Sequence, residues 1–540
     1  MQYTPEIYYN ADQKIWSGKE QPAYFSTNLS IGEIIFHEMQ RHPKLIAQIS
    51  DTENTSLSWE ELFLNSKRVA SYLRNLKLEQ SDIVGIIARN TTHISAVAYG
   101  CFFNGIAFHS VYLNYEQGVI EKLFDITKPK IIFCDGDEYE KVKAATEKLN
   151  VKIVTMRNHR DGSISIQEVL TTPIEPNFKP ARLEQGNNQN LAILCTSGTT
   201  GTPKAVTIPN TTVMVNMCSF VTSSDVLYVQ GSLEWLSGLV ITILSGIRSA
   251  LRIISDKNFS PADILRLVKK HKVTFIIQAS AQMAQIANCP EFEGDCLDSL
   301  LYCLYGAANC SIKVQQSFRR RLSSKCILIL GYGLTELGAM ASFNYHFDQK
   351  PNSSGRLGCG NKLKILNEQG ESLGPNEVGE VCLDTGRYWA GYYGNPEETR
   401  KIRDNNMWYH TGDLGYVDED GFLFIVDRKK DMLKYQSIMY YPQEIENVIA
   451  QIPEISEVCV FGNINIFNGD EAAAAVVKKH GAQLKPQDVI DYVAKHVKAT
   501  YLQLTGGVFI VDDLKRTASG KTDRRATRAY CLQNDTDKLI

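Results

Sequence analysis

A loop that follows an apolar run carries the residue types that a phosphate site needs. Residues 196–206 read TSGTTGTPKAV, directly after LAILC at 191–195. Glycines let backbone N–H groups approach an anion closely, hydroxyl groups donate further hydrogen bonds, and Lys204 supplies a compensating charge. The P-loop pattern is absent, because Pro203 stands where its second glycine belongs. A flexible surface loop with one lysine is the alternative.

A second segment, CILILGYGLTELG at 326–338, places polar side chains at the end of an apolar strand. Ligands of open α/β sheets bind beyond the carboxyl ends of the strands, where these side chains would lie. Tyr332 offers a flat face for a purine, Thr335 a hydroxyl for a phosphate, and Glu336 a carboxylate for Mg²⁺. A helix-entry turn capped by the threonine is the alternative interpretation.

Two further segments lie toward the C-terminus. YHTGDLGYVDEDGFLFIVDRKKDMLKY, at 409–435, contains Asp413, which could accept hydrogen bonds from two ribose hydroxyls or simply form a turn. Arg428 and Lys430 stand where this strand region ends, although single charges of this kind are usually solvated. RTASGKTDRR, at 516–525, presents Lys521 on a glycine-supported loop. It lacks the interleaved aromatic residues of a nucleic-acid-binding tail.

The elements that must position these residues alternate in type. Residues 82–90 and 129–136 read as buried strands, and 116–127 and 139–150 as helices, which favours parallel sheets with crossover helices. After residue 355, short segments with turn signals indicate antiparallel structure. We therefore predict an α/β fold. It has a large N-terminal domain of stacked sheets with a β-subdomain (1–426), a hinge (427–430) and a small α+β domain (431–540).

Composition excludes several classes of protein. The chain has 540 residues, with 57 Lys plus Arg against 60 Asp plus Glu, so no global charge would attract nucleic acid or anionic lipid. Its 13 cysteines form no CxxC pair, as expected of reduced, intracellular thiols rather than a disulfide framework or a zinc site. The N-terminus lacks the pattern of a signal peptide. The longest apolar stretch, near 236–247, is too short to span a bilayer, which takes about 20 residues.

In this order, TSGTTGTPK, GYGLTE, the 409–435 segment and SGK resemble the signature of the adenylate-forming superfamily. The resemblance runs from about residue 57 to 525 and is nearest to the insect luciferase-like or 4-coumarate-CoA ligase-like branch, beside the acyl-CoA synthetases. It implies that the small domain is a mobile lid that rotates between two half-reactions. A carboxylate first attacks the α-phosphate of Mg-ATP, giving an acyl-adenylate and pyrophosphate. A thiol, usually coenzyme A, then displaces AMP.

The resemblance also implies a role for each motif residue. Thr335 would hold the α-phosphate, Glu336 the metal, and Asp413 the ribose with help from Arg428. Lys521 would bridge the substrate carboxylate and the α-phosphate in the first step. Lys434 would serve the thioester step, with Lys430 at the hinge.

The β- and γ-phosphates would meet Thr196, Ser197, Gly198, Thr199, Thr200, Gly201 and Lys204. The adenine wall would be Gly306, Ala307 and Ala308, with Tyr332 and Gly333 as further cofactor-binding residues. Candidates for the acid pocket are Trp235, Leu239, Ser280, Met283 and Tyr305, with core packing an equal alternative for Leu239 and Met283.

Four departures from the family pattern limit what can be transferred. The usual histidine six residues after the loop lysine is Asn210, and the usual PxFH segment reads GSLEW, so that Glu234 or Trp235 replaces an aromatic-histidine wall. Tyr305 replaces a glycine and would narrow the carboxylate end of the pocket. These three departures are expected on the substrate side. The fourth, KYQS at 434–437 in place of KYKG, bears on the step with coenzyme A.

The leading hypothesis is an ATP-dependent acid:CoA ligase acting on a medium- or long-chain fatty acid, with an aromatic acid second. A luciferase-like oxidative enzyme and a catalytically weakened nucleotide- or acyl-binding protein are the alternatives. The last three residues, Lys-Leu-Ile at 538–540, are not the Ser-Lys-Leu peroxisomal address, so peroxisome and cytoplasm both stay open. The acid, the acceptor and the oligomeric state also stay open.

Overall fold

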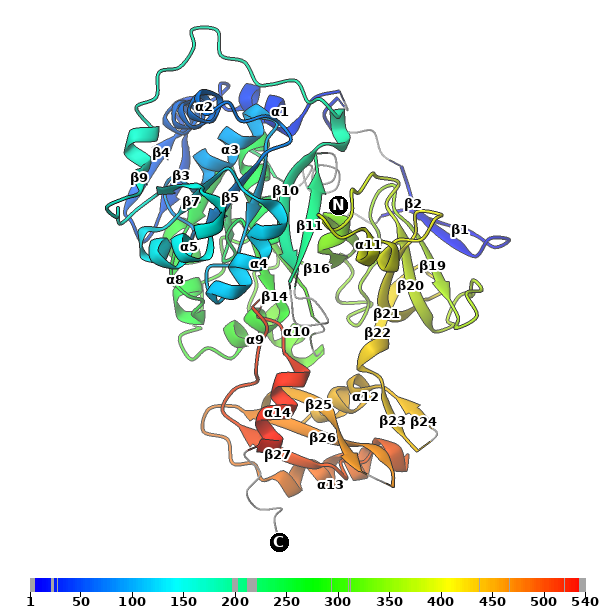
Figure 1. The fold of residues 1–540 in the computed structure, drawn as a ribbon. Coiled ribbons are helices and arrows are strands. Elements are labelled where there is room, and N and C mark those ends of the chain that lie inside the picture. Colours follow the sequence, from blue (N-terminus) through cyan, green and yellow to red (C-terminus); the bar gives the residue numbers. More distant parts are fainter. Residues whose placement is uncertain are drawn as a thin grey trace.

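The structure is a computed structural model that describes residues 5–20, 24–26, 28–196, 203–210, 221–292, 294–308, 310, 312–436, 438–465, 467–518 and 520–533. Three sheets build the larger N-terminal part, and a fourth builds a smaller C-terminal part below it in Figure 1. The mixed α/β architecture confirms the predicted fold class. No described helix combines the length and the hydrophobicity that a bilayer crossing requires.

The first sheet has the strand order β11-β10-β6-β5-β7-β8-β9. All neighbouring strands from β10 to β9 in this order are parallel. Strand β11 is antiparallel to β10, with which it forms a hairpin at the end of the sheet. Its strands are β5 (Ile83–Ile87), β6 (Ala107–Ser110), β7 (Ile131–Cys134), β8 (Lys152–Thr155), β9 (Ile164–Ser165), β10 (Asn190–Thr196) and β11 (Lys204–Pro209).

The second sheet has the order β18-β17-β16-β15-β14-β12-β13-β3-β4 and is parallel from β3 to β16. Its strands are β3 (Ile46–Ser50), β4 (Thr55–Ser58), β12 (Val226–Val229), β13 (Leu251–Ile254), β14 (Phe275–Ala279), β15 (Tyr302–Gly306), β16 (Ile327–Leu334), β17 (Ala339–Asn344) and β18 (Arg356–Leu357). The carboxyl ends of the parallel strands in each sheet therefore share one edge, which is where ligands of such sheets bind.

Helices fill the space between the two sheets and cover their outer faces. Helix α3 is buried along its whole length, and the largest apolar core joins it to both sheets. The inner helices are α1 (Ile31–Glu38), α2 (Trp59–Asn75), α3 (Ile94–Asn104) and α7 (Leu236–Arg248); α6 (Ile166–Val169) is a single turn beside α2. The outer helices are α4 (Gln117–Thr127) and α5 (Tyr139–Ala145) on the first sheet, and α8 (Pro261–His271), α9 (Ser280–Ala287) and α10 (Ile312–Arg319) on the second.

The third sheet is antiparallel, as predicted for the segment after residue 355, and it recruits the N-terminal hairpin of the chain. Its strands are β1 (Ile7–Asn10), β2 (Ile15–Gly18), β19 (Lys362–Leu366), β20 (Gly379–Asp384), β21 (Tyr409–Val417) and β22 (Leu423–Arg428), and α11 (Pro396–Ile402) lies before β21. A stretch before α11 docks on β11: the backbone N–H of Tyr393 donates to the carbonyl of Ala205 over 2.8 Å. This docking joins the third sheet to the first.

The C-terminal part is a small α+β unit with two apolar cores of its own. Its strands are β23 (Leu433–Tyr435), β24 (Ile438–Tyr440), β25 (Ile455–Asn465), β26 (Gly469–Lys478) and β27 (Gly507–Val511), and its helices are α12 (Pro442–Ile449), α13 (Pro486–His496) and α14 (Arg524–Gln533). A 3-10 turn at Lys429–Asp431 links it to β22 and overlaps the predicted hinge at 427–430. Other 3-10 turns lie at Gly136–Glu138, Glu147–Leu149, Gly186–Asn188, Thr335–Leu337 and Thr500–Leu502.

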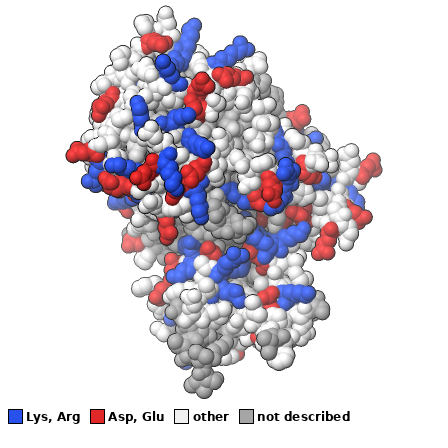
Figure 2. All heavy atoms as spheres, in the orientation of Figure 1, with Lys and Arg blue, Asp and Glu red and all other residues white. Residues whose placement is uncertain are grey.

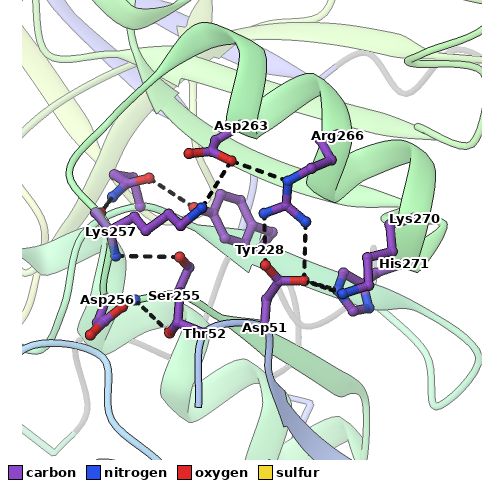
Figure 3. A network of polar contacts seen from close by, with 11 residues as sticks. Asp51, Thr52, Tyr228, Ser255, Asp256, Lys257, Asp263, Arg266, Lys270 and His271 are labelled. Atoms are coloured by element: carbon purple, nitrogen blue, oxygen red, sulfur yellow. Dashed lines mark hydrogen bonds and ion pairs between the residues drawn. The ribbon is translucent and has the colours of Figure 1, made fainter. Parts of the chain in front are cut away.

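A buried ion network fixes α8 to the end of β3. In Figure 3, Asp51 faces three side chains of α8, with its Oδ2 2.7 Å from Arg266, and its Oδ1 2.6 Å from Lys270 and 2.8 Å from His271. The Arg266 guanidinium, Lys270 and His271 hold the pKa of Asp51 well below its usual range. Because the Asp51 side chain is only 4% exposed, this carboxylate is a structural anchor for the edge of the second sheet.

Candidate active site

The end of β16 delivers the side chains of the GYGLTE motif. Strand β16 runs to Leu334, and the 3-10 turn Thr335–Leu337 follows at once, so that Thr335 and Glu336 come just after the strand. Gly333 is needed here because a Cβ atom would lie 2.7 Å from the carbonyl oxygen of Ala339 on the partner strand. The motif therefore lies at the carboxyl edge of the second sheet, as its sequence predicts.

Asp413 lies opposite this motif, on β21 of the third sheet. The hydroxyl of Tyr332 donates to its Oδ2 over 2.7 Å, and Nε of Arg428 lies 3.3 Å from its Oδ1. Asp413 and Arg428 are directly paired across β21 and β22. Burial raises the pKa of Asp413 above its ordinary value, against the opposing effect of Arg428.

Lys204 and Glu336 are linked through Tyr392, a residue outside the predicted motifs. The hydroxyl of Tyr392 donates to Oε1 of Glu336 over 2.7 Å, and Nζ of Lys204 lies 4.8 Å from the centre of the same ring. Lys204 also forms an ion pair of 2.5 Å with Glu398, on the first turn of α11. Thr196 pairs directly with Lys204 across the β10–β11 hairpin. Ser197, Gly198, Thr199, Thr200 and Gly201 lie outside the described residues.

Lys521 comes from the small domain and faces these groups. It lies in a tight turn before α14, in which the N–H of Thr517 donates to its carbonyl over 2.8 Å. Burial and the nearby Arg428 lower the pKa of Lys521, whereas Asp413 and Glu336 act in the opposite direction. Its ammonium group is thus within electrostatic reach of both carboxylates. Figure 1 shows the chain before α14 reaching up from the small part to the large one.

Lys434 lies elsewhere. It is an exposed residue of β23 in the small domain, where its backbone N–H donates to Asp470 over 3.1 Å. Burial and Arg428 lower the pKa of Lys430, the predicted hinge residue. Lys and Arg side chains gather along the junction between the two parts of the molecule (Figure 2). The two predicted catalytic lysines thus differ in environment, since Lys521 interacts with the carboxylates of the site and Lys434 is exposed.

The predicted adenine wall lies at the end of β15. Gly306 packs so closely on β16 that a Cβ atom would lie 2.3 Å from the carbonyl oxygen of Gly331. The hydroxyl of Ser280 bonds to the carbonyls of Gly306 (3.1 Å) and Ala308 (2.7 Å). Ala307 adopts φ +73°, and Ala307 and Ala308 are exposed. This stretch thus offers an exposed backbone edge fixed by Ser280, next to the GYGLTE motif.

Three of the predicted pocket residues are enclosed in cores. Leu239 and Met283 are fully buried, and Tyr305 is 1% exposed with its hydroxyl donating to Gln315 over 2.7 Å. Tyr305 and Met283 belong to the core under α8–α10, on the face of the second sheet opposite to Leu239. We therefore correct the expectation that Tyr305 narrows the pocket, because this side chain has no surface to present to a ligand. Trp235 is partly exposed and packs on Tyr112 with a centroid distance of 5.6 Å.

Asn210 and Glu234, two other departures from the family pattern, have different environments. Asn210 follows β11 at the end of the hairpin opposite to Lys204, and its side chain bonds to the backbone of Ile31 and Gln189 (3.3 and 3.2 Å). It is a structural contact, so the expectation that it lies on the substrate side is also corrected. Glu234 is buried just before α7, and burial raises the pKa of its carboxyl to about 7.

A magnesium ion fits the carboxylate that this edge offers. Among the described residues, no group of three His, Cys, Asp or Glu side chains comes together as a metal site. Magnesium is usually bound by one or two protein carboxylates together with the phosphates of its nucleotide, and it does not need a complete protein cage. A single carboxylate such as Glu336 therefore suits this ion.

Family models cover most of the chain. Residues 35–393 match the AMP-binding enzyme model, and residues 444–521 match the AMP-binding enzyme C-terminal domain model. The chain belongs to the AMP-binding enzymes, the adenylate-forming superfamily. This confirms the resemblance drawn from the motifs.

Relatives of this AMP-binding enzyme include a CoA ligase and a monooxygenase. It is 26% identical to 4-coumarate--CoA ligase 3 of Oryza sativa subsp. japonica over 93% of this chain and 92% of the relative. It is also 26% identical to luciferin 4-monooxygenase of Photinus pyralis, over 95% and 96%. The crystal structure of the anthranilate CoA ligase AuaEII in complex with anthranoyl-AMP shares the fold with a TM-score of 0.85 at 18% identity, covering 94% of this chain and 98% of that one.

Tyr392 and Glu398 were missed by sequence reasoning. Both lie in GYYGNPEETR, 391–400, which contains no phosphate or metal motif. The one local signal is Asn395-Pro396 followed by two glutamates, which predicts a helix start with acidic residues in its first turn. That signal locates α11 but not its neighbour, because the contact with Lys204 depends on the docking of 391–393 on β11.

Proposed function

We propose that the protein is an ATP-dependent carboxylic acid:CoA ligase. An oxygen of the acid attacks the α-phosphorus of ATP, the bond to pyrophosphate breaks, and an acyl-adenylate forms. The sulfur of coenzyme A then attacks the acyl carbon, and the bond to AMP breaks. The observation that carries the proposal is that Asp413, Glu336 and Lys204, from three different sheets, meet through two tyrosines. Tyr332 donates to Asp413 and Tyr392 to Glu336, each over 2.7 Å, and Lys204 lies over the Tyr392 ring.

The residues at this convergence suit the first step. Lys204 and the loop that begins at Thr196 would bind the β- and γ-phosphates, Thr335 the α-phosphate, and Asp413 with Arg428 the ribose. The adenine would lie against Gly306, Ala307, Ala308, Tyr332 and Gly333. Lys521 would bind the carboxylate and the α-phosphate together, which reduces the repulsion between two anions and orients the attack. Magnesium bound through Glu336 would neutralise phosphate charge.

The second step would use the other lysine. Lys434 would enter the site after the small domain has turned about Lys430, so that one pocket could run two reactions in sequence. Closure would also protect the adenylate from water. A medium- or long-chain fatty acid is the first substrate class to test, since each buried methylene contributes about 0.8 kcal/mol. An aromatic acid is the second, in keeping with the names of the relatives.

A panel assay tests the proposal. Purified protein is incubated with ATP, Mg²⁺ and single acids, with and without coenzyme A, and pyrophosphate, AMP and thioester are measured. Thioester that depends on coenzyme A supports the ligase. Adenylate that is consumed only with oxygen would instead support a luciferase-like oxidation. ATP binding without turnover on any acid would mean a nucleotide-binding protein that has lost its chemistry.

A further inference from the structure

The cation and the carboxylate assigned to Mg-ATP are both already engaged by one neighbouring segment. Nζ of Lys204 lies 2.5 Å from Oε2 of Glu398, and the two side chains are 16% and 25% exposed. The hydroxyl of Tyr392 donates to Glu336 over 2.7 Å. Tyr392 and Glu398 lie just six residues apart, on either side of the start of α11. The segment 391–401 thus satisfies both groups.

Glu398 is held in place independently of Lys204. Its backbone N–H is capped by Oδ1 of Asn395 over 3.1 Å, and its other carboxylate oxygen, Oε1, lies 2.5 Å from Nζ of Lys401. The two ammonium groups lower the pKa of this carboxyl to about 2, so it is ionised at neutral pH. Lys401 would keep the carboxylate paired if Lys204 left it.

The same segment also fixes where Lys204 can go. Thr207, three residues further along β11, donates through its hydroxyl to the carbonyl of Gly391 over 2.7 Å, and Tyr393 bonds to Ala205. The ammonium of Lys204 lies over the Tyr392 ring, whose hydroxyl meets Glu336. If Lys204 leaves Glu398, its side chain therefore stays next to the Tyr392 ring, whose hydroxyl contacts Glu336.

We propose that Glu398 is a positioning residue that occupies the anion site of Lys204 until the terminal phosphates of ATP replace it. The inference rests on the proposed function. The exchange keeps every charge paired, because Lys204 passes from a carboxylate to a phosphate and Glu398 keeps Lys401. Glu398 therefore competes with the phosphates for Lys204, and it prevents this lysine from pairing elsewhere.

A double-mutant cycle tests this competition. Binding of magnesium tripolyphosphate and of Mg-ATP is measured by calorimetry for wild type, Glu398→Gln, Lys204→Ala and the double variant. Tripolyphosphate probes the phosphate site without adenine or acid. We expect Glu398→Gln to bind both probes about three- to tenfold more tightly, since a partly exposed ion pair is worth on the order of 1 kcal/mol. In the Lys204→Ala background the same substitution should change nothing.

Matched variants separate this role from general charge and from folding. Glu397→Gln removes a charge one residue away, from a side chain that is 78% exposed and lies 3.7 Å from Lys401, and it should leave both affinities unchanged. Melting temperatures report on folding. If Lys204→Ala fails to fold, Lys204→Met keeps the aliphatic stem on the Tyr392 ring and takes its place in the cycle.

Each outcome decides the question. If Glu398→Gln binds tripolyphosphate and ATP no more tightly than wild type, the proposed competition is wrong. It is also wrong if the substitution raises affinity equally in the Lys204→Ala background. If the protein binds tripolyphosphate but makes no adenylate with any acid, the proposed function is wrong. The double-mutant cycle then still tests whether Glu398 competes with phosphate for Lys204. Wild-type protein that binds neither probe refutes both.

Discussion

The hydroxyl of Tyr332 donates to Oδ2 of Asp413 over 2.7 Å, and this bond joins the end of β16 to β21, two strands of different sheets. The nucleotide site proposed here is therefore assembled between sheets and not within one. Arg428 approaches the other oxygen of the same carboxylate at 3.3 Å. Asp413 is thus oriented from both sides before any ribose arrives.

Asp413→Asn should weaken ATP binding at least tenfold, because hydrogen bonds to a charged acceptor are worth roughly 1.5–3 kcal/mol. The sharper readout is the preference for ATP over 2′,3′-dideoxy-ATP, which wild type should show and the variant should lose. Asp418→Asn, on the turn after the same strand, is the control for loss of a charge and should keep the preference. An equal loss of affinity for both nucleotides would contradict the assignment of Asp413 to the ribose.

Lys521→Ala should reduce ATP–pyrophosphate exchange by about 10² or more, the usual effect of removing one donor at a developing charge, with little change in ATP affinity. Lys434→Ala is its counterpart, since this lysine is exposed on β23 and is assigned to the second step. That variant should keep the exchange and lose thioester formation. Normal pyrophosphate release by Lys521→Ala would remove this lysine from the first step.

Glu234→Gln should change how stability depends on pH. Burial raises the pKa of Glu234 from 4.5 to about 7, with the nearby Asp135 acting in the same direction. Between these values the folded protein binds the proton more tightly than the unfolded chain, so this group's contribution is complete below pH 4.5 and is lost as the pH rises through 7. The glutamine variant does not titrate. Its melting temperature relative to wild type should therefore rise from pH 5 to pH 8, by an amount that corresponds to at most about 3 kcal/mol.

A constant difference between the two proteins at pH 5 and pH 8 would mean that Glu234 titrates normally in the folded state. Glu60→Gln, at an exposed position on the first turn of α2, is the control and should show that constant difference.

Asp51→Asn should lower the free energy of unfolding by roughly 1.5–3 kcal/mol, because Arg266, Lys270 and His271 of α8 would lose their bonds to a charged acceptor. Asp295→Asn provides the comparison. It removes the partner of another α8 lysine, Lys269, at 2.8 Å, but its side chain is 65% exposed, and such pairs contribute roughly 0–1 kcal/mol. Thermal or denaturant unfolding of both variants measures the difference, and equal destabilisation would contradict a special role for Asp51.

The sequence predicted the placement of site residues that lie in short motifs. It did not predict the contacts that depend on distant segments. Tyr332, Thr335 and Glu336 follow an apolar strand, so their place at a sheet edge could be deduced from local pattern alone. Tyr305 lies on a strand with both faces buried, where alternation carries no signal about which face a side chain takes. Glu398 reaches Lys204 only because residues 391–393 pair with β11, a contact across nearly 200 positions that no local pattern contains.

The exposed position of Lys434 has a consequence for which step limits the rate of turnover. If this lysine and Lys521 serve successive steps in one pocket, each catalytic cycle must include a large swing of the small domain and its return. The observed rate would then be limited by hydrodynamic drag whenever the chemistry is fast. Added glycerol should slow multiple turnovers while sparing the first burst of pyrophosphate.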